Sequence, residues 1–217
     1  MAIAIRGASG AYLYVANTTP ITLPAVTNAG DAIILVQGCE SSGDIAPSGA
    51  GATWVQCTAV GDWSPSGEML TWLGYNCSAG NSQISVASAS NTSQWTTYSV
   101  AMFSGVPTTG SSLGATATAN AGTVGPISFV AGDLVIAAAV MGSGNTPITW
   151  STLSFSGGTA SSLGSRNATA YMPDTAGIYM LPSSAGSTSA TFAGTYGINA
   201  SAIFVIDSYR SVRSKRQ

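Results

Sequence analysis

The chain has 217 residues, with eight acidic residues, six basic residues and no histidine. The lack of histidine excludes Ser-His-Asp and Cys-His catalysis and histidine metal centres. Four of the six basic residues lie in the last eight positions, so residues 1–209 hold two basic and eight acidic groups, a net charge of −6. A body this acidic excludes a phosphate-neutralising surface for nucleic acid.

The order of residue types along the chain predicts strands. Few Glu, Lys and Arg are present to solvate a helix, whereas Thr, Val and Ile suit a half-buried sheet. Short apolar segments alternate with Gly, Asn, Pro and Ser clusters, and none keeps a helical period, so we expect an all-β sandwich of about twelve strands. The expected strands span residues 12–16, 32–38, 53–59, 69–76, 83–88, 97–104, 114–119, 133–141, 151–155, 168–172, 189–192 and 201–209.

Two of these segments, 32–36 and 134–140, are continuously apolar. Strands of this kind are typical of the centre of a sandwich, where both faces of the sheet are buried. A Gly-Asp pair precedes each segment, at Asp31 and Asp133. We interpret both pairs as turn chemistry, because Gly permits positive φ and an Asp carboxylate can accept backbone hydrogen bonds.

The two Gly-Asp pairs belong to a weak internal repeat. We expect a single domain over 1–209, with a first half at about 11–106, a linker at 107–126, a second half at about 127–209 and a basic tail at 210–217. Each half would supply half the strands of a pseudo-symmetric sandwich. The repeat pairs Asp31 with Asp133, Pro47 with Pro147, Trp54 with Trp150, Tyr75 with Tyr171 and Gly80 with Gly177.

The same motifs carry a family resemblance. The order "GDAIILV", "PSGAGATW", "WLGYNCSAG", followed by a second cycle of "GDLVIAAAV" and "PITW", resembles phage-encoded minor tail and other virion proteins, especially those of actinobacterial phages. The resemblance covers about 21–209. It implies a jelly-roll-like or lectin-like β-sandwich used in virion architecture or host attachment, without assigned catalytic residues.

We therefore expect a virion structural protein, a minor tail protein acting in assembly or host attachment, and not an enzyme. Capsid decoration and carbohydrate binding are the alternatives. The expected partners are other virion subunits and copies of the chain in a symmetric homo-oligomer, with a trimer as one candidate and host cell-wall glycan as a further partner. We expect no nucleic-acid partner, no membrane partner, no cofactor and no metal, and synthesis in the host cytoplasm before incorporation into the virion.

The cysteine pattern and the N-terminal sequence both bear on the expected synthesis in the host cytoplasm. Cys39, Cys57 and Cys77 are odd in number and lack a CxxC spacing, so we expect buried free thiols, with one disulfide and a leftover thiol as the alternative. Free thiols fit a reducing compartment. The first residues lack the features of a secretory signal, and the apolar run 134–141 is shorter than the ~20 residues that span a bilayer.

Candidate contact residues concentrate between 38 and 69. Glu40, Asp44, Asp62 and Glu68 are expected in or near loops, where solvated charges are the first interpretation and a calcium site or a hydrolase pair are alternatives. Trp63, in "GDWSPSG", is expected either to pack over the sandwich end or to contact a sugar or a partner. Trp95 poses the same choice.

The basic tail is the other candidate contact. We expect it to be either a solvated terminus or a docking segment for an acidic neighbouring subunit. Its basic residues are Arg210, Arg213, Lys215 and Arg216.

Overall fold

The computed structural model confirms an all-β sandwich. It describes residues 2–15, 18–39, 46–63, 67–87, 94–107, 113–141, 150–156, 158–166, 174–194 and 199–208. These ranges hold sixteen strands in four antiparallel sheets, where about twelve strands were expected, and they hold no helix.

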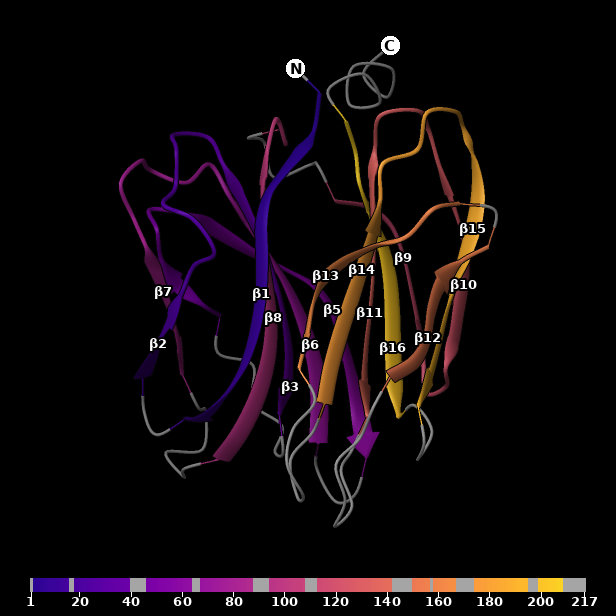
Figure 1. Ribbon diagram of the computed structural model, residues 1–217, viewed down its shortest axis with the longest axis horizontal. Coiled ribbons are helices and arrows are strands. Elements are labelled where there is room, and N and C mark those ends of the chain that lie inside the picture. Colours follow the sequence, from indigo (N-terminus) through magenta and orange to yellow (C-terminus); the bar gives the residue numbers. More distant parts are fainter. Residues whose placement is uncertain are drawn as a thin grey trace.

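The first eight strands form one half of the molecule (Figure 1). Five of them make a large sheet of order β1-β8-β3-β6-β5, and three make a small sheet of order β2-β7-β4. Their bounds are β1 (Ala4–Val15), β2 (Thr18–Thr22), β3 (Ala32–Cys39), β4 (Ser48–Gly49), β5 (Thr53–Trp63), β6 (Gly67–Tyr75), β7 (Gln83–Ala87) and β8 (Gln94–Ser104).

The last eight strands form the second half. Their large sheet has the order β13-β14-β11-β16-β9 and their small sheet the order β10-β15-β12. Adding eight to each strand number of the first half reproduces both sheets, so the two halves share one strand order. The bounds are β9 (Leu113–Ala119), β10 (Thr123–Phe129), β11 (Leu134–Met141), β12 (Trp150–Phe155), β13 (Ser161–Arg166), β14 (Asp174–Met180), β15 (Gly186–Gly194) and β16 (Ala200–Ile206).

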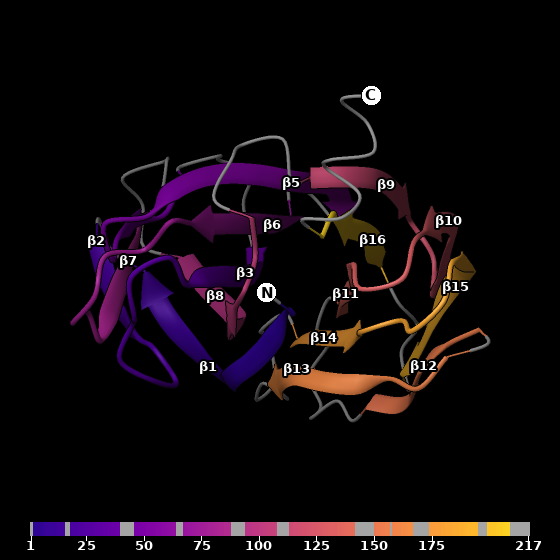
Figure 2. The ribbon, with the colours of Figure 1, turned by 90° about the horizontal axis from the view of Figure 1, so that it is seen from above.

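The four sheets stack as four layers (Figure 2). The two large sheets face each other in the middle, and a small sheet covers the outer face of each. Edge strand β1 lies beside β13, and β5 lies beside β9. β13 is the counterpart of β5, and β9 is the counterpart of β1, so each edge strand lies beside the counterpart of the other edge strand of its own sheet. An approximate two-fold axis parallel to the strands produces this arrangement.

Strands β3 and β11 lie at the centre of this stack, and every residue of both is buried. Side chains alternate between faces, so Ile33 and Leu35 enter the core under the small sheet while Ile34 enters the core between the halves. In β11, Leu134 and Ile136 face the first half. Continuous apolar sequence was the signal for burial on both faces, and that prediction is confirmed.

Five strands, β2, β4, β10, β13 and β14, are absent from the sequence prediction. β4 has only two residues, and β2 contains a proline. All residues of β14 except Tyr179 are buried, yet the strand begins Asp-Thr-Ala-Gly, because the two large sheets approach closely there and leave room only for small side chains. The expected linker 107–126 contains β9 and the start of β10, and the expected strand 168–172 lies outside the described residues.

Two of the five predicted residue pairs are wrong. Trp54 lies in β5, whereas Trp150 lies in β12, the counterpart of β4. Gly80 lies in the turn after β6, whereas Gly177 lies within β14. Loops of different length in the two halves destroy any constant spacing. Asp31 and Asp133 do occupy equivalent turns; Pro147 and Tyr171 lie outside the described residues.

The strand ends define two ends of the molecule (Figure 1). At the lower end, β3, β5 and β11 finish and β6, β8 and β14 begin. The upper end carries the turns that lead into β3 and β11 and those that leave β6 and β14.

Candidate functional site

The sequence-predicted contact residues that the structure describes lie at the lower end. Asp62 and Trp63 were expected in a loop, but they are the last two residues of β5. The hairpin continues further than expected, with Gly61 opposite Glu68 and Trp63 opposite Gly67. A register shift between Gly61 and Trp63 accommodates this polar, turn-like sequence within the strand.

The large sheet brings these positions into one row. Glu68 lies opposite Gly61 on one side and Cys39 on the other, and Cys39 lies opposite Thr96, the residue after Trp95. Trp95 itself pairs with Tyr14 of β1. Asp62, Trp63, Glu68 and Trp95 therefore share the lower end of one sheet.

The remaining candidates lie outside the described residues. These are Glu40, Asp44, Arg210, Arg213, Lys215 and Arg216.

The upper end of the first half is closed by a hydrogen-bond network between its turns. Thr27 donates its hydroxyl to the Ser78 carbonyl at 2.6 Å and accepts the Asn81 backbone N–H at 3.0 Å. The Ser78 backbone N–H reaches the Ala50 carbonyl at 2.9 Å. Leu23, Ala50 and Cys77 are buried in the adjacent core cluster. Turn residues therefore fill the space between the two sheets.

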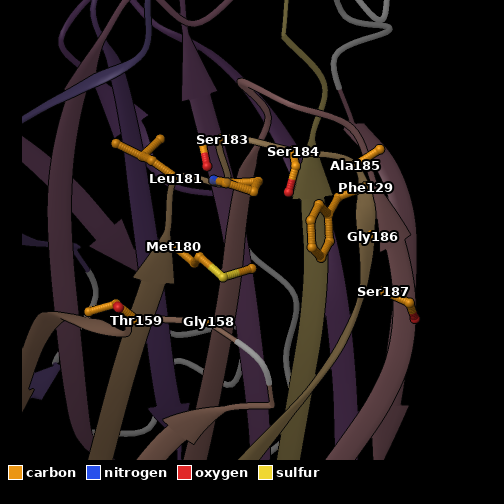
Figure 3. Close-up of a pocket in the computed structure, with 11 residues that line it drawn as sticks. Phe129, Gly158, Thr159, Met180, Leu181, Ser183, Ser184, Ala185, Gly186 and Ser187 are labelled. Carbon is orange, nitrogen blue, oxygen red and sulfur yellow. The ribbon is translucent and has the colours of Figure 1, made fainter.

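The upper end of the second half carries a pocket of about 340 Å³ (Figure 3). It lies where β10, β14 and β15 end or begin, and no charged residue lines it. Figure 3 shows the Phe129 ring on one side, the Met180 side chain opposite, and the hydroxyls of Ser183 and Ser184 turned toward the same space. The full lining is Phe129, Gly158, Thr159, Met180, Leu181, Pro182, Ser183, Ser184, Ala185, Gly186 and Ser187.

Shorter loops explain the hollow at this end of the second half. The connection from β10 to β11 has four residues, 130–133, where its counterpart has nine, 23–31. The connection from β14 to β15 has five, 181–185, where its counterpart has seven, 76–82. Less chain remains to fold back over the space between the sheets.

Small residues shape the pocket further. A Cβ at Gly158 would collide with the Met180 sulfur, and a Cβ at Gly186 would lie 3.2 Å from Cζ of Phe129. Sequence reasoning missed this site. The available signal was the repeated "SAG" at 78–80 and 184–186, which aligns the turn at 76–82 with the shorter turn at 181–185.

The thiols are buried and free, as expected: Cys39, Cys57 and Cys77 form no disulfide. Burial raises the pKa of Cys57 to about 12. Burial, assisted by the nearby negative charge of Asp31, raises the pKa of Cys77 to about 11. Both thiols are protonated at neutral pH, so neither is an activated nucleophile.

Within the described ranges, no three Cys, Asp or Glu side chains gather in a way that could hold a metal ion. The same ranges contain no helix with the length and apolar character needed to cross a bilayer. No protein-family model, curated protein or solved structure matches this chain.

Proposed function

We propose that the protein is a bacteriophage virion structural protein, a minor tail protein that acts in assembly or host attachment. One observation carries the proposal: two eight-stranded halves with the same strand order are fused through a common core. Eight strands in two facing sheets is the composition of a jelly roll, an architecture of viral capsid and lectin domains. Each half resembles a jelly roll in which the fifth strand, β5 or β13, belongs to the larger sheet, so that the sheets have five and three strands.

The fused core gives the molecule the rigidity that a building block needs. Phe103 and Phe204 are fully buried between the large sheets, and burial of each ring contributes roughly 1.5–3 kcal/mol to the free energy of unfolding. Phe103 also meets Tyr179 of the other half edge to face, with ring centroids 5.4 Å apart. The halves therefore behave as one body rather than as two domains on a linker.

The composition fits a subunit that hides its surface in an assembly. Only 6% of the residues are charged, so hydroxyl and amide groups must keep the surface hydrated. A symmetric homo-oligomer follows as the expected state, with a trimer as one candidate.

The location in the virion is open to a direct experiment. Particles purified from a phage that encodes this chain would be separated into heads and tails, and the chain would be quantified in each fraction by mass spectrometry. We expect enrichment in tails. Enrichment in heads would favour capsid decoration, and absence from both fractions would contradict a virion role.

Carbohydrate binding is the second candidate, and the upper-end pocket favours it. Its lining combines an aromatic ring with uncharged hydroxyl groups, a combination that suits a sugar. Binding to host cell-wall glycan is compatible with a tail protein and also with an independent binding module.

A further inference from the structure

The upper-end pocket of the second half occupies a place that the first half fills with its own chain. Phe129 lies opposite Gly186 across β10 and β15, and Leu23 is hydrogen-bonded to Ser82 at the equivalent place in the first half. Leu23 is buried under its turns, whereas Phe129 borders the pocket. The repeat thus provides an internal reference that shows which contacts are missing at this end.

The groups facing the pocket are of two kinds. The Phe129 ring and the Met180 thioether provide an apolar wall, and Ser183 and Ser184 provide hydroxyls directed into the same space (Figure 3). Within the described part of the chain, these two hydroxyls make no hydrogen bond. They are available to a bound molecule as both donors and acceptors.

We propose that this pocket binds a neutral saccharide unit. A sugar ring has an apolar C–H face that can lie on Phe129 and hydroxyls that can bond to Ser183 and Ser184. An uncharged lining offers no cation to offset the charge of a phosphate or carboxylate, and a purely apolar ligand would cover the serine hydroxyls without replacing their bonds to water.

The size and openness of the pocket set the ligand class and the affinity. Small-molecule sites span roughly 300–1,000 Å³, and this pocket lies at the lower end of that range, which suits one or two sugar rings. Few hydrogen bonds and one ring contact lead us to expect a dissociation constant on the order of 1 mM. Such a site gains useful strength when several copies bind together.

The Met180 methyl group gives a direct reporter of the site. Protein labelled with ¹³C at its methionine methyl groups would be titrated with methyl β-glucoside, methyl β-galactoside and methyl β-N-acetylglucosaminide, and Met180→Leu would assign the Met180 signal. We expect a saturable shift of that signal with at least one sugar. The signal of Met69, which is fully buried in another part of the core, should not move.

Matched variants locate the binding. Ser184→Leu should fill the pocket and abolish the shift, and Phe129→Ala should weaken the affinity at least tenfold. Ser82→Leu places the same side chain at an exposed serine of the first half and should leave the affinity unchanged. The methyl spectrum of each sugar-free variant checks that the fold is retained.

Three results would overturn the site: no shift with any of the three sugars, full binding by Ser184→Leu, or binding lost in Trp63→Ala but retained in Phe129→Ala. The last result would place the sugar at the lower end. Binding here does not depend on where the protein sits in a virion, so a failure of this titration leaves the tail assignment to its own test.

Discussion

Asp31 and Asp133 make the same turn in the two halves with different second partners. Each carboxylate accepts the backbone N–H three residues before it, from Asn28 at 2.7 Å and from Val130 at 2.9 Å. Asp31 then pairs with Arg6 of β1. Asp133 instead accepts the backbone N–H of Ser208 at 2.7 Å, which ties the end of β16 to the same turn.

This difference predicts unequal costs of removing the two carboxylates. Asp133→Ala would remove the acceptor of two backbone N–H groups, that of the buried Ser208 and that of the exposed Val130, and we expect a loss of about 1–3 kcal/mol in the free energy of unfolding. Asp31→Ala would leave the N–H of the exposed Asn28 and a partly exposed guanidinium, both within reach of water, with an expected loss of about 0.5–1.5 kcal/mol. Urea denaturation measures both, with Ser48→Ala as an exposed control. Equal costs would contradict the account.

Two buried hydroxyls between the large sheets are expected to destabilise the protein. Thr97 and Thr175 flank Gly38, and neither hydroxyl oxygen has a hydrogen-bond partner among the residues that the structure describes. Thr97→Val and Thr175→Val keep the side-chain shape and remove the unpaired group, so each should raise the free energy of unfolding by about 1 kcal/mol.

The matched control for these variants has the opposite expected sign. The hydroxyls of Thr58 and Thr71 are 2.5 Å apart and bonded to each other in the same core. Thr58→Val would leave Thr71 unpaired, at a cost of about 1–2 kcal/mol. If all three variants shifted the urea midpoint in one direction, hydrogen bonding would not be what distinguishes these sites.

Local signals in the sequence were sufficient for the centre of the fold. The Gly-Asp pairs predicted turns, and Gly30 and Gly132 do have positive φ, at 82° and 87°. The apolar runs of β3 and β11 predicted burial on both faces because a buried strand cannot alternate. These features depend on a few consecutive residues, so they could be predicted without knowing what packs against them.

The ends of the sandwich could not be predicted in this way. Asp62 and Trp63 sit in a turn-like sequence, and only pairing with β6 makes them part of a strand. The upper-end pocket arises from a difference in loop length between the two halves, and no particular residue type in the sequence marks such a pocket. The repeated "SAG" aligns the two turns, but only the shared strand order shows that the loops around Phe129 and at 181–185 are shorter than their counterparts.

Close packing of the halves predicts a large effect from one methyl group. A Cβ at Gly38 would lie 2.6 Å from Cγ2 of Val140 on the opposite sheet. Gly38→Ala should therefore cost about 1–3 kcal/mol in unfolding free energy. Gly61→Ala, on β5, is the matched control and should be close to neutral, because a Cβ there would meet no atom of the described residues within 4 Å.

The contact between Gly38 and Val140 can be tested by a double-mutant cycle. Val140→Ala makes room for the added methyl group, so Gly38→Ala should cost at least 0.5 kcal/mol less in that background, about the smallest coupling that such a cycle resolves. Additive costs in the double variant would show that the halves do not meet at these two residues.

The buried thiol of Cys57 predicts a loss of stability in alkaline solution. Its pKa is raised from 9.0 to about 12 in the folded protein, so between these values the unfolded chain releases a proton that the folded chain keeps. The unfolded state is then favoured as the pH rises. Above pH 9 this thiol should lower the free energy of unfolding by roughly 1.4 kcal/mol per pH unit.

Comparing the wild type with Cys57→Ala isolates this contribution from other groups that titrate in the same range, including Cys77 and Tyr98, whose pKa values burial also raises. Urea denaturation at intervals from pH 7 upward gives the free energy of unfolding for both proteins. Cys57→Ala should be less stable near neutral pH because it leaves a small cavity, and the gap should close as the pH rises above 9. Curves that stay parallel throughout would mean that the Cys57 thiol is not shielded from solvent in the folded protein, and that the core between the halves is open at β5.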